Sequence, residues 1–131
     1  MGRIKQVILI RKDLKMRRGK EIAQGSHASM QFLVTQIINQ KITDFTQIPV
    51  SLSDVELAWL DKGMAKVCLR VNSEEELLQY HEKAKAAGIK SYLIRDSGRT
   101  EFAGQPTYTA CAIGPAEVNG IDAITGDLVP Y

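Results

Sequence analysis

The run Val7-Ile-Leu-Ile10 constrains the fold more than any other feature of this 131-residue chain. It holds no polar residue and is rich in β-branched ones, which is typical of a strand that is covered on both faces. A strand of this kind needs a layer of structure on each side of its sheet. The run therefore predicts a sheet that lies between layers of helices.

Helical and strand-like segments alternate along the rest of the chain. Gly19 precedes a helix over about 20–39, and capping patterns that begin at Ser53 and Ser73 predict two further helices. Three more strands are expected over 66–71, 91–94 and 107–113, the last ended by Gly114 and Pro115, before a short C-terminal helix. This order predicts one domain over 1–131 with a three-layer α/β/α sandwich architecture. Its four-stranded sheet is expected to be mixed and mostly parallel, with the fourth strand antiparallel and helices on both faces.

The helix over 20–39 carries two separate stripes when its residues are placed at 100° intervals. The apolar stripe is expected to face the core and comprises Ile22, Ala23, Met30, Leu33, Val34 and Ile37. The polar stripe lies on a different side and comprises Lys20, Gln24, His27 and Gln31. Polar groups that converge on one line of a helix suggest a ligand site, although a histidine beside small residues is also a common structural hydrogen-bonding group.

Positive charge is concentrated near the N-terminus, although the net charge of the chain is only +2. Residues 1–20 hold eight basic side chains and one acidic side chain, whereas the remaining 111 residues have a net charge of −5. The densest cluster lies between the first strand and the first helix and comprises Arg11, Lys12, Lys15, Arg17, Arg18 and Lys20. This asymmetry favours a surface that contacts nucleic-acid phosphates. The alternative is that basic residues crowd a solvated terminus without a partner.

Asp96 follows the third strand directly and precedes the polar segment Gly98-Arg99-Thr100. A carboxylate at the end of a strand is a candidate for accepting a proton or orienting a cation, and it is an equally good candidate for capping a turn. Ligands of open α/β sheets bind beyond the carboxyl ends of the strands. The loops that follow Arg11 and Asp96 are therefore expected to face one crevice.

The spacing of residues in the chain excludes several other kinds of site. A phosphate-binding loop needs Gly where this chain has Leu14, and Ser or Thr where it has Glu21. Cys68 and Cys111 lie in apolar runs without metal-ligand spacing, so we expect no metal, no redox pair, and two core thiols in a reducing compartment. His81 lies among charged residues and is expected to be solvated. No apolar run approaches the roughly 18 residues that span a bilayer, so we expect no membrane partner and a cytoplasmic protein.

Two separated motifs resemble one known family. Arg11-x-Asp-Leu-x-Met-x-x-Gly-Lys20-x-x-Ala-Gln24-x-x-His27-Ala resembles the N-terminal signature of the type 2 peptidyl-tRNA hydrolase family. Asp96-Ser-Gly-Arg-Thr100, followed by Thr109, Ile113-Gly-Pro and Ile124-Thr-Gly, resembles its C-terminal signature in the same order. The likeness extends from about residue 5 to Tyr131.

This resemblance implies a hydrolase that cleaves the ester between a peptide and the 3′ end of tRNA, with no metal and no cofactor. It also implies a homodimer. The positions that match the family's active site are Lys20, His27, Asp96, Thr100 and Thr109. We expect Asp96, with His27, to position or deprotonate the attacking water, and Lys20, the helix N-terminus and Thr100 to stabilise the oxyanion. Contacts to the acceptor-stem phosphates of peptidyl-tRNA are expected from Arg11, Lys12, Lys15, Arg17 and Arg18. Gln24, on the wall of the ester pocket, and Arg99 are also expected to bind the substrate.

Other functions are compatible with the same fold, because a fold alone does not fix an activity. A non-catalytic RNA-binding module would bind tRNA in a salt-dependent way and release no peptide. A protein-interaction scaffold that docks a partner on the long helix would have no affinity for tRNA. A nucleotide-binding enzyme is disfavoured by the missing phosphate-loop glycine and by the absence of any Gly-x-Gly-x-x-Gly motif.

Overall fold

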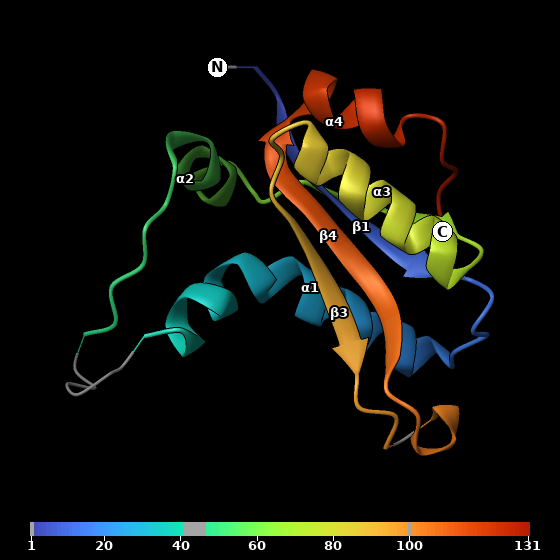
Figure 1. The fold of residues 1–131 in the computed structure, drawn as a ribbon. Coiled ribbons are helices and arrows are strands. Elements are labelled where there is room, and N and C mark those ends of the chain that lie inside the picture. Colours follow the sequence, from blue (N-terminus) through green and yellow to red (C-terminus); the bar gives the residue numbers. More distant parts are fainter. Residues whose placement is uncertain (1, 41–46, 100) are drawn as a thin grey trace.

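A four-stranded sheet forms the centre of the protein in the computed structural model, which describes residues 2–40, 47–99 and 101–131. The strands are β1 (Ile4–Arg11), β2 (Lys66–Val71), β3 (Ser91–Asp96) and β4 (Thr107–Glu117), and their order in the sheet is β2-β1-β4-β3 (Figure 1). Three strands run in one direction and β4 runs in the other, as the sequence predicts. Because β4 lies between β1 and β3, it makes antiparallel pairs with both, and the parallel pair is β1 with β2.

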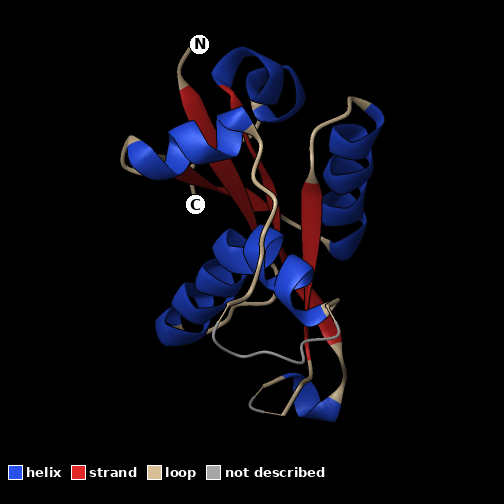
Figure 2. Ribbon diagram, turned by 90° about the vertical axis from the view of Figure 1, so that its left-hand side faces the viewer, coloured by secondary structure: helices blue, strands red, loops and turns tan. Residues whose placement is uncertain are grey.

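Helices cover both faces of this sheet, so the predicted α/β/α sandwich is confirmed (Figure 2). The helices are α1 (Arg18–Ile38), α2 (Asp54–Asp61), α3 (Glu74–Ala86) and α4 (Val118–Thr125), and a single 3₁₀ turn covers Phe102–Gly104. On one face, α3 and α4 pack on a cluster that includes Val7, Leu9, Leu77, Ile113 and Ile121. On the opposite face, α1 packs on Ile8, Ile10, Ala110 and Ala112. The alternate residues of β1 thus belong to two cores, which explains its continuous apolar run.

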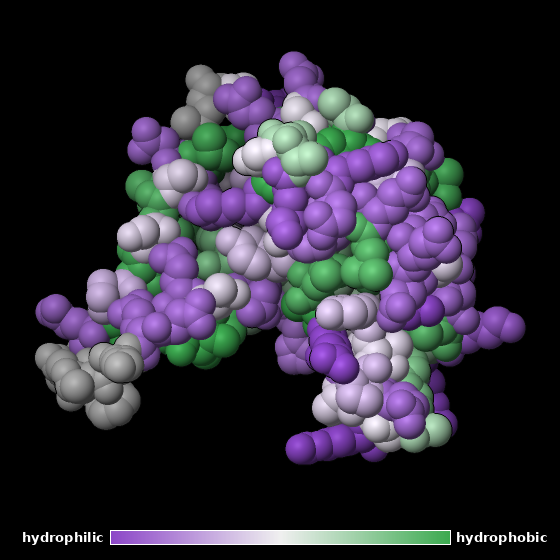
Figure 3. Space-filling model, viewed as in Figure 1, coloured by the Kyte–Doolittle hydropathy of each residue, from purple (hydrophilic) through white to green (hydrophobic). Residues whose placement is uncertain are grey.

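Hydrophilic side chains gather over α3 on the face shown in Figure 3, as expected for a helix that buries only one stripe. Helix α2 lies on the same side of the sheet as α1. It begins with the predicted capping box, in which Ser53 Oγ accepts from Glu56 N at 3.1 Å and Ser53 N donates to Glu56 Oε1 at 2.9 Å. Trp59 of α2 packs edge-on against Phe32 of α1, with ring centroids 6.0 Å apart. This contact attaches α2 to the α1 layer. Among the described residues, no helix is both long and apolar enough to cross a membrane.

Strand β4 is longer than its pattern predicts, because it does not end at Gly114 and Pro115 but continues to Glu117. Its pairing with β1 shifts at this point: Lys5 pairs with Ala116, whereas Val7 pairs with Ile113. One extra residue of β4 is therefore accommodated as a bulge, and pairing resumes beyond it. Gly114 has a φ of +90°, and a Cβ there would lie 2.8 Å from the backbone nitrogen of Ala116, so glycine is required at this bulge.

The predicted core stripe of α1 is wrong at three positions. Ile22, Ala23 and Met30 are exposed, Ile22 and Met30 to 64% and 57%, and the residues of α1 that the sheet buries are Gln24, Ala28 and Phe32. The helix is therefore rotated so that part of its polar stripe faces the sheet. The physical reason is the hydrogen-bonded partner that β4 provides for the buried amide of Gln24, described below.

Two predictions about single residues also fail. His81 is buried instead of solvated: it is only 8% exposed, and its Nδ1 lies 2.6 Å from Ser91 Oγ, which in turn lies 3.1 Å from Cys111 Sγ. Burial lowers the pKa of His81 and raises the pKa of Cys111 to about 11. Cys111 is a core thiol as predicted, but Cys68 is exposed, because β2 is an edge strand whose first residues are not covered.

Candidate active site

An ion pair between Lys20 and Asp96 forms the centre of the site. Lys20 lies in the first turn of α1, Asp96 is the last residue of β3, and their Nζ and Oδ1 atoms are 2.7 Å apart. Both side chains are largely buried, with exposed fractions of 15% and 10%. The carboxyl ends of β1 and β3 lie at the same end of the sheet, because both strands run antiparallel to β4. The loops that follow Arg11 and Asp96 therefore lie at the same end of the sheet, as the sequence predicts.

A buried hydrogen-bond chain supports Asp96 from the sheet. Thr109 of β4 donates its hydroxyl to Gln24 Oε1, and Gln24 Nε2 donates to Asp96 Oδ1 at 3.4 Å. Thr109 is fully buried and Gln24 is 2% exposed, so neither side chain presents a surface to solvent. Because the hydroxyl donates to the amide oxygen, the amide nitrogen is held toward the carboxylate. Thr109 therefore orients Gln24, and Gln24 contacts Asp96.

The second carboxylate oxygen of Asp96 caps a turn. Gly98 N donates to Asp96 Oδ2 at 2.9 Å, so both roles that the sequence allows for Asp96 are present in one side chain. The hydrogen bond from Lys20 lowers the pKa of Asp96, burial opposes it, and Gly98 N and the charges of Lys20 and His27 lower it further. Asp96 is consequently ionised at neutral pH. Gly98 has a φ of +84°, and a Cβ there would lie 2.4 Å from the backbone oxygen of Gln105, so only glycine fits this turn.

Phe102 is a member of the site that the sequence analysis does not single out. The Nζ atom of Lys20 lies 6.0 Å from the centroid of the Phe102 ring, at the outer limit of a cation–π contact. Phe102 is a partly buried residue of the 3₁₀ turn and packs against the apolar cluster beneath α1. Its signal in the sequence is a single aromatic residue within the polar segment that follows Asp96.

His27 lies at the edge of this centre, one turn of α1 beyond Gln24. Its imidazole is exposed and lies close enough to Asp96 for its charge to act on the carboxylate. It also lines a groove of about 520 Å³ between α1 and β3. Thr100, the remaining predicted active-site residue, lies outside the described residues.

The predicted tRNA-contacting residues divide into an exposed group and two side chains that the protein holds, Gln24 and Arg11; Gln24 is buried beneath Asp96, as described above. The exposed group surrounds the start of α1 and the turn after β3 and comprises Lys12, Lys15, Arg17, Arg18 and Arg99. Arg11 differs, because its guanidinium is held by the protein: it donates to both carboxylate oxygens of Asp13, at 3.2 and 2.7 Å, and to the backbone oxygen of Tyr108 at 3.0 Å. With only 9% of Arg11 exposed, its side chain fixes the loop after β1.

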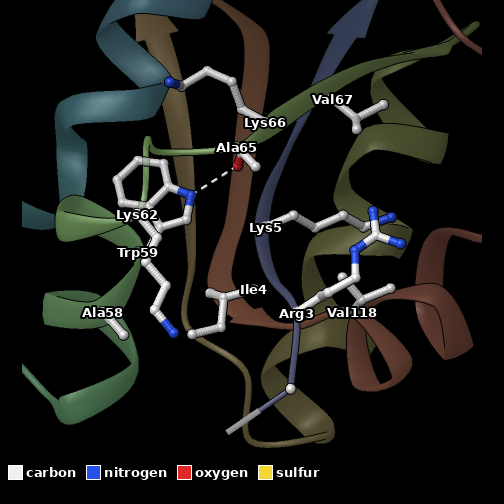
Figure 4. A pocket seen from close by; sticks show the side chains of 11 residues that line it. Arg3, Ile4, Lys5, Ala58, Trp59, Lys62, Ala65, Lys66, Val67 and Val118 are labelled. Atoms are coloured by element: carbon white, nitrogen blue, oxygen red, sulfur yellow. Dashed lines mark hydrogen bonds between the residues drawn. The ribbon is translucent and has the colours of Figure 1, made fainter.

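A cavity lined by basic residues lies at the opposite end of the sheet, at the amino ends of β1 and β2 (Figure 4). It has a volume of about 540 Å³, and its basic lining residues are Arg3, Lys5, Lys62 and Lys66. Lys5 pairs with Asp122 at 2.6 Å, and Lys66 lies over the Trp59 ring at 5.2 Å from its centroid. Arg3 and Lys5 thus belong to the basic N-terminal segment of the sequence. In the fold they lie the length of a strand, about 25 Å, from the end of the sheet that carries Asp96.

Comparison with known proteins identifies the family. A family model described as peptidyl-tRNA hydrolase PTH2 matches residues 4–131. The chain belongs to this family. A peptidyl-tRNA hydrolase of Methanopyrus kandleri is 43% identical over 125 residues, with 95% of each chain covered. One from Methanocaldococcus jannaschii is 40% identical over 127 residues, covering 95% of this chain and 97% of the relative. A probable peptidyl-tRNA hydrolase 2 of Dictyostelium discoideum is 38% identical over 131 residues, which span 56% of that longer protein.

A solved structure of a protein of unknown function from Agrobacterium tumefaciens has the same fold as this chain. It superposes with a TM-score of 0.58 over 100% of this chain and 99% of that chain, at 16% identity. In the ranges of the chain that the structure describes, no group of three or more His, Cys, Asp or Glu side chains is placed to hold a metal ion. The polar centre consists of Lys20, Asp96, Gln24 and Thr109.

Proposed function

We propose that this protein hydrolyses the ester bond between a peptide, or an N-blocked aminoacyl group, and the 3′ end of tRNA. One observation carries the proposal: the ion pair of Lys20 with Asp96, 2.7 Å long and largely buried, lies beside the exposed basic cluster at the start of α1. The cation of such a pair can stabilise the oxyanion that forms during ester hydrolysis, and the neighbouring cations can bind the phosphates of a polyanionic substrate. The family name of the relatives points to the same substrate.

In the proposed reaction, water attacks the ester carbonyl carbon. The ionised carboxylate of Asp96 accepts a hydrogen bond from the water and orients it, while the imidazole of His27 takes its proton as the new C–O bond forms. The lowered pKa of Asp96 makes it a weak base, so its role is to orient the water and hold Lys20 in place. Collapse of the tetrahedral intermediate then breaks the bond to the 3′ oxygen of tRNA, which takes the proton held by His27 as it leaves.

Lys20 stabilises the negative charge that develops on the carbonyl oxygen. Its ammonium lies in the first turn of α1, where the helix dipole adds partial positive charge. The hydroxyl of Thr100 is proposed to donate to the same oxygen. Gln24 and Thr109 are positioning residues, because they reach the reacting atoms only through Asp96.

The exposed cations provide the proposed contacts to the acceptor stem. Lys12, Lys15, Arg17, Arg18 and Arg99 place several positive charges around the entrance to the Lys20–Asp96 centre. Such contacts are sequence-independent, which suits an enzyme that accepts many tRNAs. Arg11, whose donors are held by Asp13 and Tyr108, stabilises the loop that carries Lys12 and Lys15.

The family resemblance further supports a homodimer and a location in the cytoplasm, where peptidyl-tRNA arises during translation. Light scattering during size-exclusion chromatography tests the first proposal. A mass twice that of one chain is expected, and a monomer at micromolar concentration contradicts it.

The direct test of the proposed function compares N-acetyl-aminoacyl-tRNA with free aminoacyl-tRNA as substrates. The wild-type protein should release the blocked amino acid and leave the free ester largely intact, and Asp96→Ala should cleave the blocked substrate far more slowly. Binding of tRNA without release of the blocked amino acid by the wild type would show a non-catalytic RNA-binding module instead.

A further inference from the structure

We infer that the groove between α1 and β3 holds the peptide part of the substrate, as an extended chain that runs beside the free edge of β3. The groove has a volume of about 520 Å³ and includes His27 among its lining residues. This inference rests on the proposed function and adds to it the place where the peptide lies.

One wall of the groove is a single stripe of α1. His27, Met30, Gln31 and Val34 line it, and their spacing of three, four and seven residues places them on one face of the helix. The stripe begins with His27, whose charge acts on Asp96, and ends with the apolar side chain of Val34. A groove that starts at the reacting centre is suited to the part of the substrate attached to the scissile carbonyl.

The other wall is the edge of β3. Leu93, Ile94 and Arg95 all line the groove, although neighbouring side chains of a strand point to opposite faces. A groove that touches three consecutive strand residues therefore runs along the edge of the strand and reaches its main chain. Within the described residues β3 pairs only with β4, so its other edge carries unpaired N–H and C=O groups. An extended peptide can hydrogen-bond to such an edge as an added strand.

The direction of the groove matches the two halves of the substrate. The exposed cations lie at the start of α1, before Lys20, whereas the groove extends from His27 toward the C-terminal half of the helix. The acceptor stem and the peptide would then leave the ester in opposite directions. From His27 to Val34 the helix rises by about 10 Å, which is the length of about three extended residues.

Two other cavities of the described residues are not lined by His27 or by the Lys20–Asp96 pair. An apolar groove on the other side of α1 is lined by Ile22, Met64, Cys68 and Tyr131 among others, and it contains neither Lys20, His27 nor Asp96. The basic cavity of Figure 4 lies at the opposite end of the sheet. Of these three, only the α1–β3 groove is lined by His27 and by Arg95, the neighbour of Asp96.

The test uses one tRNA that carries N-acetylated peptides of one to five alanine residues. We expect kcat/KM to rise by about tenfold between one residue and three, equivalent to about 1.4 kcal/mol, and to stay level for longer peptides. Because a strand edge binds main-chain groups, replacing the second alanine by serine or valine should change kcat/KM by less than about threefold.

Two variants locate the effect. Val34→Asp places a charge on the apolar part of the wall, and Gln31→Trp fills the groove. In both, the ratio of kcat/KM for the three-residue peptide to that for the one-residue peptide should fall from about ten to about one. Ile38→Asp is the matched control, because Ile38 lies on the same helix, is 68% exposed and does not line the groove; its ratio should stay near ten.

A ratio near one in the wild type, or a ratio that stays near ten in either groove variant, overturns the inference. These outcomes differ from a failure of the proposed function. If the wild type cleaves neither blocked substrate, the hydrolase proposal itself is wrong; if it cleaves both equally well, only the peptide groove is wrong.

Discussion

Thr109→Val tests whether the buried support of Asp96 matters for catalysis. The substitution keeps the shape of the side chain and removes the hydroxyl that donates to Gln24 Oε1. Because Thr109 is fully buried, the change cannot act through direct contact with substrate. Any effect on the reaction must pass through Gln24 and its hydrogen bond to Asp96.

The magnitudes follow from the geometry. The amide oxygen of Gln24 belongs to a residue that is 2% exposed, and leaving it without its donor costs about 1–3 kcal/mol of stability. At about 3–4 °C per kcal/mol for a domain of this size, Tm should fall by about 3–12 °C. The hydrogen bond from Gln24 Nε2 to Asp96 is long, 3.4 Å, so its loss should cost the transition state about 1–1.5 kcal/mol, or about tenfold in kcat.

The assay measures kcat and KM for N-acetyl-aminoacyl-tRNA and Tm by circular dichroism. The control is Thr107→Val on the same strand, because the Thr107 hydroxyl donates to the nearby backbone oxygen of Gln105 at an exposed position. The control should leave kcat unchanged, and KM should be unchanged in both variants. If Thr109→Val lowers Tm as expected but leaves kcat within twofold of wild type, the hydrogen-bond chain is only structural and our reasoning is refuted.

Three further predictions use other parts of the chain. Arg18→Gln should reduce the slope of log Kd for tRNA against log salt concentration by about one. The control Arg3→Gln, at the other end of the sheet, should leave this slope unchanged. Equal slopes in the two variants would exclude Arg18 as a phosphate contact. Burial lowers the pKa of His81, so below about pH 6.5 the unfolded chain binds more protons than the folded protein, and stability should decrease as pH falls from 7.5 to 5.5. The Tm of His81→Gln should depend less on pH than that of the wild type. An equal dependence would contradict the lowered pKa of His81. One thiol, that of Cys68, should react with a maleimide in the native protein and two after denaturation, because Cys111 is fully buried; rapid native labelling of both would contradict this burial.

The element order and the layered architecture could be predicted because local patterns determine them. The continuous run of β1, the capping box at Ser53 and the cap at Ser73 each require only neighbouring residues. The position of β4 between β1 and β3 could not be predicted in this way, because strand order depends on packing across the whole sheet. The extension of β4 past Gly114 could not be predicted either, because a bulge and a strand end have the same sequence signal.

The candidate site shows the same limit. The spacing of Lys20, Gln24 and His27 predicts that they share a side of the helix, but a 100° plot does not say which stripe faces the sheet. The sheet buries Gln24 because Thr109, a residue 85 positions away, provides its hydrogen-bond partner. Arg11 and the exposed cations look alike in the sequence, and only the contacts to Asp13 and Tyr108 distinguish them.

The central claim is that the Lys20–Asp96 pair carries out ester hydrolysis, and Lys20→Ala tests it most directly. The measurement is the single-turnover rate of cleavage of N-acetyl-aminoacyl-tRNA at saturating enzyme, which removes any effect of tRNA affinity. The loss of one oxyanion-stabilising group predicts a rate about 10²–10³ times lower than that of the wild type. A rate within a few-fold of wild type would contradict the account.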